Sequence, residues 1–165
     1  MGEVNLGAIN LAANVPLEQT LAHMLGSRVY FDTNIFIYVL DNIVGLADVC
    51  VPFFKAIEAH DIFGCSGDMA IAELLVKPMQ TDDRVNIERI HALFDNELGY
   101  FEAIPHPRET LVLAAQLRAT QRLKMIDAIH AATAIKGGCK YFVTHDAGLA
   151  KNFQGLEVVD IKAYL

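Results

Sequence analysis

Short apolar segments alternate with helical segments along most of this chain, and this order constrains the fold more than any other feature. Segments that read as strands cover residues 28–32, 61–66, 100–104, 140–144 and 156–159. Apolar residues at helical spacing predict helices over residues 33–40, 51–60, 69–76, 82–96, 107–120 and 124–136. Short apolar strands separated by helices are typical of βαβ units. We therefore predict a three-layer α/β/α fold around a central parallel sheet of four to five strands.

The length of 165 residues predicts one domain, which we assign to residues 28–165, preceded by an extension over residues 1–27. Within the extension, residues 16–25 have apolar side chains at helical spacing. This pattern predicts a short docking helix that buries Leu17, Leu21 and Leu25, with Asn14 as its N-cap and Gly26 after its end. The alternative is an extension without a docking role. Further along, Pro78 is expected to end the helix over residues 69–76.

Charge and composition limit the classes of function. The chain has 13 Lys and Arg against 20 Asp and Glu, a net charge of −7. This weighs against a surface that binds nucleic acid all over, but it does not exclude an enzyme that meets phosphate through a carboxylate-bound metal. Three cysteines without a CxxC pair predict reduced core thiols. The lack of a basic leader and of an apolar stretch of about 20 residues predicts a soluble cytoplasmic protein, not a membrane protein.

Four carboxylates stand out because of their positions in the predicted elements. Asp32 closes the first strand and Asp146 follows the fourth, so a parallel sheet would place both at one edge. Glu73 and Asp127 interrupt apolar helical segments, where a carboxylate is costly unless it is paired or bound to a metal. Four converging acids would repel one another, and a divalent cation would relieve that repulsion. Oxygen ligands suit Mg²⁺ or Mn²⁺.

Each of these acids also has a purely structural interpretation. Asp32 and Asp146 could cap the helical segments that follow them, and Asp127 could charge the first turn of its helix. Glu73 could be half exposed at the end of a short helix. Taken singly the structural interpretation is favoured, but the joint occurrence of all four indicates a shared site.

Two histidines lie close to these acids in the sequence. His130 shares a helix face with Asp127, and we interpret it as a supporting residue that is not a ligand. His145 adjoins Asp146, and an exposed loop histidine is the default interpretation. No GxGxxG, GxxxxGK[ST] or GxSxG motif is present, which excludes dinucleotide-binding, P-loop and serine hydrolase sites.

The segments around the four acids together resemble those of PIN-domain nucleases. They read VYFDTNI over residues 29–35, IAELL over 71–75, LKMIDAIHAATA over 123–134 and FVTHD over 142–146. Their order and spacing fit that family across roughly residues 28–160. The chain departs from the family where Cys65-Ser66-Gly67-Asp68 replaces a Ser/Thr-rich turn, and in having the extension over residues 1–27.

The resemblance implies a metal-dependent endoribonuclease that hydrolyses RNA phosphodiester bonds. Asp32, Glu73, Asp127 and Asp146 would hold one or two Mg²⁺ or Mn²⁺ ions. Thr33, Asn34 and Thr144 would orient those ligands or a water. Two other classes remain open. One is a non-catalytic PIN-like module that binds RNA or protein. The other is a haloacid dehalogenase-type phosphohydrolase, disfavoured because Asn34 stands where that class needs a second acid.

Small PIN domains of this length resemble VapC-type toxins of toxin–antitoxin pairs. That resemblance implies an antitoxin partner whose peptide covers the site, and a homodimer. Arg118, Arg122 and Lys124 form a basic set just before Asp127 and are candidate RNA contacts. Arg118 and Arg122 are four residues apart and are expected to share a helix face, which could contact backbone phosphates or simply be solvated.

Overall fold

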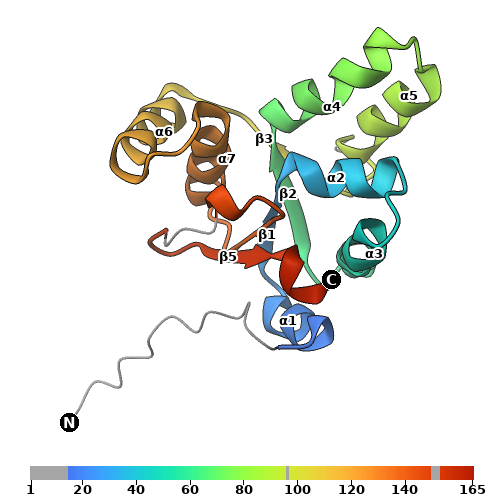
Figure 1. Cartoon of the computed structure of the whole chain (residues 1–165), viewed down its shortest axis with the longest axis horizontal. Coiled ribbons are helices and arrows are strands. Elements are labelled where there is room, and N and C mark those ends of the chain that lie inside the picture. Colours follow the sequence, from blue (N-terminus) through green and yellow to red (C-terminus); the bar gives the residue numbers. More distant parts are fainter. Residues whose placement is uncertain (1–14, 96, 150–152) are drawn as a thin grey trace.

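A five-stranded parallel sheet with the order β3-β2-β1-β4-β5 forms the centre of the molecule (Figure 1). The computed structural model describes residues 15–95, 97–149 and 153–165. The strands are β1 (Arg28–Phe31), β2 (Phe63–Gly67), β3 (Glu102–Ile104), β4 (Tyr141–Thr144) and β5 (Glu157–Asp160). In the centre of the sheet, Tyr30 pairs with Cys65 on one side and Phe142 on the other. The predicted parallel α/β fold is confirmed.

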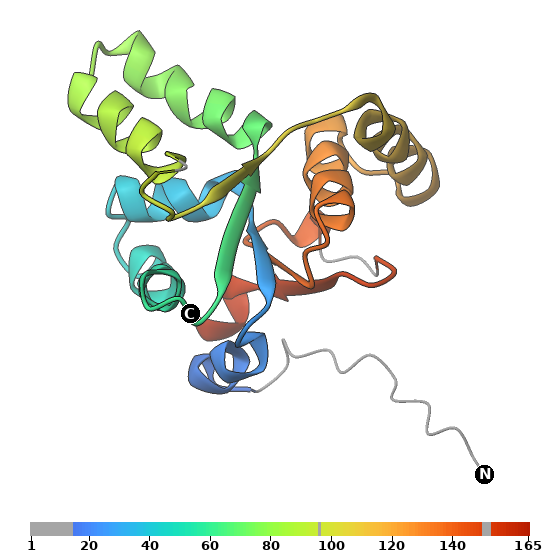
Figure 2. The same cartoon turned by 180° about the vertical axis from the view of Figure 1, so that it is seen from behind.

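Helices cover both faces of the sheet, as Figures 1 and 2 show from opposite sides. Helices α2 to α5 lie on one face, and α6 and α7 lie on the other. The helices are α1 (Leu17–Met24), α2 (Thr33–Leu40), α3 (Leu46–Glu58), α4 (Asp68–Gln80), α5 (Arg84–Leu93), α6 (Arg108–Gln121) and α7 (Met125–Lys136). Two short 3-10 segments, Ala147–Leu149 and Ile161–Tyr164, follow β4 and β5. Within the described ranges, none of the helices combines the length and apolarity needed to cross a bilayer.

The two faces of β1 each belong to a separate apolar core. Val29 and Phe31 pack with residues of α2, α3 and α5. Tyr30, which points the opposite way, packs with residues of α6 and α7. The three cysteines are buried and free, as predicted. Because β1 is buried on both faces, the residue that ends it is held by both cores.

Two helices that contain a proline have boundaries that differ from the predicted ones, and Pro78 does not end its helix as expected. Helix α3 begins at Leu46, five residues before the predicted start, and includes Pro52. Helix α4 continues through Pro78 to Gln80. A proline inside a helix costs about 3 kcal/mol in isolation. Here Pro78 is buried, and Phe53, next to Pro52, has no exposed surface, so tertiary packing offsets the local penalty.

The helix of the N-terminal extension is present, and its buried face agrees with the prediction in part. Leu17 and Leu21 are partly buried and pack against the core, as predicted. Met24 and Thr20 are fully buried, whereas Leu25, which we expected inside, is 59% exposed. The hydroxyl groups of Thr20 and Tyr164 lie 2.8 Å apart. Asn14, the predicted N-cap, lies outside the described residues. Because α1 directly precedes β1, it lies at the end of the sheet opposite to the one where β1 leads into α2 (Figure 1).

Candidate functional site

All four carboxylates singled out in the sequence line one cleft of about 390 Å³. The cleft lies where the carboxyl end of β1 meets α2, α4 and α7, the position at which open parallel sheets form sites. Its lining consists of Asp32, Thr33, Asn34, Ile37, Glu73, Val76, Ile126, Asp127, His130 and Asp146. The fold therefore brings together acids that are up to 114 residues apart in the sequence, Asp32 and Asp146.

Asp32 caps a helix and also lines the cleft. Its Oδ1 accepts a hydrogen bond from the Thr33 amide at 2.8 Å, which caps α2. Its Oδ2 accepts one from the Thr144 hydroxyl at 2.7 Å. Burial raises the pKa of Asp32 above its ordinary value and the charge of Glu73 adds to this, although both hydrogen bonds and His130 oppose the shift. The carboxylate is thus fixed in orientation at the floor of the cleft.

Glu73 projects from α4 and receives two hydrogen bonds at one oxygen. Its Oε2 lies 2.6 Å from the Thr33 hydroxyl, which donates to it, and 2.9 Å from Nε2 of His130. Burial alone would raise the pKa of Glu73, but these two donors lower it below its ordinary value. Glu73 is therefore held ionised, and it ties α4 to both α2 and α7.

His130 contacts Glu73 from inside the core. Its ring is almost completely buried, and Nδ1 lies 2.7 Å from the Tyr30 hydroxyl. In the tautomer that donates from Nε2 to Glu73, Nδ1 accepts a hydrogen bond from the Tyr30 hydroxyl. Tyr30, His130 and Glu73 then form one directed chain of hydrogen bonds. The sequence offered one signal for Tyr30, a buried phenol that must find a partner.

Asp146 and Asp127 close the opposite side of the cleft. Asp146 accepts a hydrogen bond from the Gly148 amide at 2.7 Å, and its own amide donates to Thr144 at 3.0 Å. Thr144 thereby links Asp146 to Asp32. Burial raises the pKa of Asp127, and repulsion from Asp146 and then Asp32 adds to this, while Lys124 opposes it. Together with the repulsion between Glu73 and Asp32, these interactions link all four acids electrostatically.

The donor set suits a hard divalent cation, although the ligand geometry is not assembled. Carboxylate oxygens are the ligands that Mg²⁺ and Mn²⁺ prefer. The mutual repulsion at Asp127 is a cost that such a cation would relieve. Among the described residues, no three acidic, histidine or cysteine side chains converge closely enough to form a metal site. The fit thus lies in the chemistry of the donors and in their shared cleft.

The other predicted residues take varied positions. Thr33 and Thr144 contact the acids, and Asn34 lines the cleft. His145 is partly buried, and its Nδ1 lies 2.6 Å from the Tyr38 hydroxyl, so it differs from the exposed histidine that we expected by default.

The basic set is exposed at the end of α6 and just before α7, and one part of its predicted geometry is wrong. Arg118, Arg122 and Lys124 are all exposed. However, α6 ends at Gln121, and Arg122 adopts a left-handed backbone conformation with φ of 57°. Arg122 therefore leaves the helical repeat and does not share a regular helix face with Arg118. Lys124 is electrostatically coupled to Asp127, so it is the member of the set placed to act near the acids.

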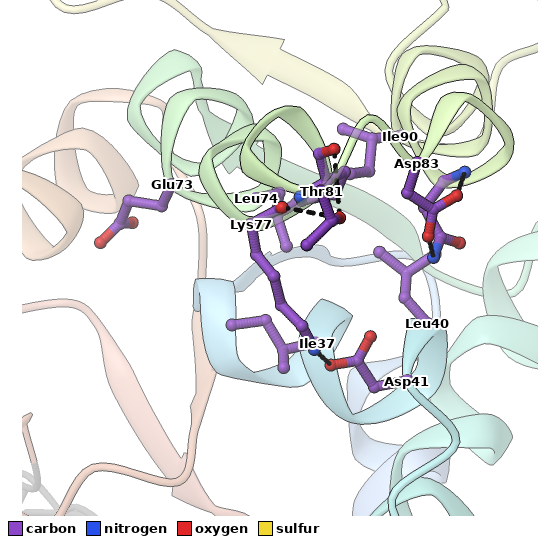
Figure 3. A pocket seen from close by; sticks show the side chains of 11 residues that line it. Ile37, Leu40, Asp41, Glu73, Leu74, Lys77, Thr81, Asp83 and Ile90 are labelled. Carbon is purple, nitrogen blue, oxygen red and sulfur yellow. Dashed lines mark hydrogen bonds and ion pairs between the residues drawn. The ribbon is translucent and has the colours of Figure 1, made fainter.

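A second hollow of about 330 Å³ adjoins the acidic cleft between α2, α4 and α5 (Figure 3). Ile37 and Glu73 line both. Its wall includes Leu40, Leu74 and Ile90, and Lys77 crosses it to form an ion pair with Asp41 at 2.7 Å. The carboxylate of Glu73 points away from this ion pair (Figure 3). A groove of mixed polar and apolar lining therefore adjoins the acidic cleft and shares Ile37 and Glu73 with it.

The sequence matches the family model described as PIN domain over residues 29–152. It matches no curated protein significantly. Several solved structures are similar in fold, each with a TM-score of 0.58. A toxin–antitoxin complex from Klebsiella pneumoniae is 21% identical, covering 78% of this chain and 94% of that one. VapBC2 from Rickettsia felis bound to a promoter DNA fragment is 17% identical, covering 81% and 98%. DNA-bound VapBC from Salmonella typhimurium is 17% identical, covering 82% and 98%.

Proposed function

Because the chain belongs to the PIN-domain family, we propose that it is a metal-dependent endoribonuclease and the toxin of a toxin–antitoxin pair. The observation that carries this proposal is the gathering of Asp32, Glu73, Asp127 and Asp146 in one cleft. A protein that used these acids only as helix caps would have no reason to bring them together at a cost in repulsion. Intact acids at all four positions also argue against a non-catalytic module.

Mg²⁺ or Mn²⁺, held by the four acids, would activate water for attack and offset negative charge on the phosphate. The protein's own groups set the donors in place. Thr33 and Thr144 fix Asp32, while Thr33 and His130 together occupy one oxygen of Glu73 and leave Oε1 for the cleft. These contacts orient two of the ligands before any substrate binds, which lowers the cost of assembling the site.

RNA is the substrate that the family resemblance favours. Positively charged side chains in this part of the chain could bind its phosphate backbone. Lys124 lies close enough to Asp127 to act on its carboxylate, and Arg118 and Arg122 are exposed nearby in the chain. Each such cation that meets a phosphate releases counterions, so binding should weaken as salt rises. The net charge of −7 confines this attraction to a local surface.

The partner that we propose is an antitoxin, with a peptide segment that covers the acidic cleft. The structures of similar fold include complexes described as toxin–antitoxin or VapBC. The groove between α2, α4 and α5 is apolar in part and shares Glu73 with the cleft, so one extended segment could fill both. A cytoplasmic homodimer completes the proposal.

The test is cleavage of RNA by the purified chain with Mn²⁺ or Mg²⁺, and with EDTA. We expect cleavage that EDTA stops, with a loss of roughly 100-fold in Asp32→Asn and Asp127→Asn. Asp160→Asn is the matched control. Asp160 also ends a strand and caps the helical turn after it, through the Lys162 amide, but it does not line the cleft. Equal activity in wild type, Asp32→Asn and Asp160→Asn would overturn the proposal.

A further inference from the structure

His106 connects the two helices that carry Glu73 and Asp127, although it is not among the residues that line the cleft. It lies between β3 and α6. Its Nε2 accepts a hydrogen bond from the Met69 amide at 2.9 Å, in the first turn of α4. Its Nδ1 lies 3.0 Å from the hydroxyl of Thr133 on α7. One imidazole ring therefore bridges α4 and α7.

These two contacts select one form of the ring. A backbone amide can only donate, so Nε2 carries no proton, and Nδ1 of the neutral ring carries it and donates to Thr133. The Thr133 hydroxyl in turn donates a hydrogen bond to the Ile129 carbonyl at 2.7 Å. Burial lowers the pKa of His106, with His130 adding to this and Asp68 opposing it, which agrees with a neutral ring.

The start of α4 needs this acceptor. The first amides of a helix have no partner within it, and a capping side chain commonly satisfies one. The N-cap of α4 is Gly67, which has no side chain to give. His106 supplies the missing acceptor from a different part of the chain. It is thus a helix cap that also holds α7.

The packing around the ring leaves little freedom. A Cβ at Gly67 would lie 2.6 Å from Cε1 of His106 and 2.9 Å from the Tyr30 hydroxyl, so only glycine fits there. Pro105 and Pro107 flank His106 and restrict its backbone on both sides. The ring is therefore held in place by its own segment and packs against Gly67, where β2 ends and α4 begins.

We propose that His106 is a positioning residue for the acidic cleft, fixing Glu73 relative to Asp127 by clamping the first turn of α4 to α7. Met69 lies one turn before Glu73, and Thr133 lies one turn after His130, the residue that bonds Glu73. Loss of the clamp lets α4 shift against α7 while both helices remain folded. The role of this clamp in catalysis rests on the proposed nuclease function, whereas the clamp itself does not.

The test compares variants of the full chain by three measurements. Hydrogen exchange at the Met69 amide reports the cap, calorimetry reports Mn²⁺ affinity, and RNA cleavage reports kcat and KM separately. We expect His106→Leu to exchange faster at Met69, to bind Mn²⁺ roughly 10-fold more weakly and to lose about 10-fold in kcat with KM little changed. His106→Gln, whose amide oxygen can still accept from Met69, should recover most of the loss.

Controls separate positioning from general destabilisation. Tyr164→Phe removes a hydrogen bond to Thr20 at the opposite edge of the sheet, and should cost stability without changing kcat or Mn²⁺ affinity. Thr133→Val removes only the α7 end of the clamp, and should weaken Mn²⁺ binding and lower kcat as His106→Leu does. It provides the test if His106→Leu folds poorly. Unchanged Met69 exchange in His106→Leu would refute the clamp. Wild-type Mn²⁺ affinity and kcat in that variant would refute its positioning role. A wild type that neither binds Mn²⁺ nor cleaves RNA would instead refute the proposed function.

Discussion

The Tyr30 hydroxyl lies 2.7 Å from Nδ1 of His130, beneath the floor of the acidic cleft. Tyr30 is fully buried in the central strand, and its ring stacks on Phe142 of the neighbouring strand at 5.1 Å between centroids. The other ring nitrogen of His130 bonds Glu73. The orientation of a carboxylate at the surface is thus set by a phenol that never meets solvent.

Replacing Tyr30 by Phe should therefore reduce activity more than stability alone explains. The variant keeps the ring but leaves Nδ1 of His130 without its buried donor, at a cost of roughly 1–3 kcal/mol. The His130 ring can then change tautomer and withdraw its proton from Glu73. We expect kcat for RNA cleavage to fall with KM little changed. Denaturant unfolding and steady-state kinetics measure the two effects.

Tyr141→Phe is the matched control for this prediction. It deletes the same atom from a buried tyrosine of the same sheet, whose hydroxyl donates to the His23 carbonyl at 3.0 Å, far from the acids. Stability should fall while kcat stays at the wild-type value. Equal kcat values in the two variants would mean that the Tyr30 hydroxyl has no part in positioning Glu73.

Metal binding should stabilise the folded chain, and the effect should depend on Asp32. A cation that binds only the folded state adds about 2.7 kcal/mol when its free concentration is 100 times its dissociation constant. Asp32→Asn removes one donor and relieves part of the repulsion, so it should be at least as stable as wild type in EDTA and gain less from Mn²⁺. Thermal melts with Mn²⁺ and with EDTA measure both. A shared metal site would be contradicted if Mn²⁺ did not change the melting midpoint of the wild type, or if it raised the midpoint of Asp32→Asn by the same amount.

Asp127 and Glu73 should show opposite dependences of stability on pH in the absence of metal. The raised pKa of Asp127 means that its folded state binds a proton more tightly than its unfolded state. Its ionised form is thus destabilising at neutral pH, and that penalty disappears as pH falls through the raised pKa toward about 3.9. The lowered pKa of Glu73 has the reverse effect: its ionised form stabilises above about 4.3 and that gain is lost on acidification.

Two isosteric variants isolate these contributions. Asp127→Asn should be more stable than wild type at pH 7 in EDTA, and the difference should shrink toward pH 4. Glu73→Gln should be less stable than wild type at pH 7, and its deficit should also shrink toward pH 4. Urea unfolding at several pH values gives both differences. The same sign for both variants at pH 7 would show that the two acids do not occupy the contrasting environments described here.

The sequence predicts where the acids lie better than it predicts the hydrogen bonds that hold them in place. Asp32 and Asp146 are predictable because a parallel sheet collects the residues after its strands at one edge. The Tyr30–His130 bond joins residues 100 positions apart, and the His106–Met69 bond joins residues 37 apart. Such contacts depend on how whole helices pack, which local patterns do not encode. The predicted end of α4 before Pro78 was wrong for the same reason, because burial of Pro78 offset the local penalty.

The buried face of α1 predicts that substitutions at two adjacent residues change stability by very different amounts. Met24 and Leu25 are adjacent apolar residues of this helix, but only Met24 enters the core, while Leu25 is exposed. Met24→Ala should cost about 2–5 kcal/mol, because it deletes a buried side chain and leaves a cavity. Leu25→Ala should change stability by no more than about 0.5 kcal/mol. Neither should alter kcat, because α1 lies at the edge of the sheet opposite to the acids. Equal losses of stability in urea unfolding, or a loss in Leu25→Ala alone, would show that α1 docks by a different face.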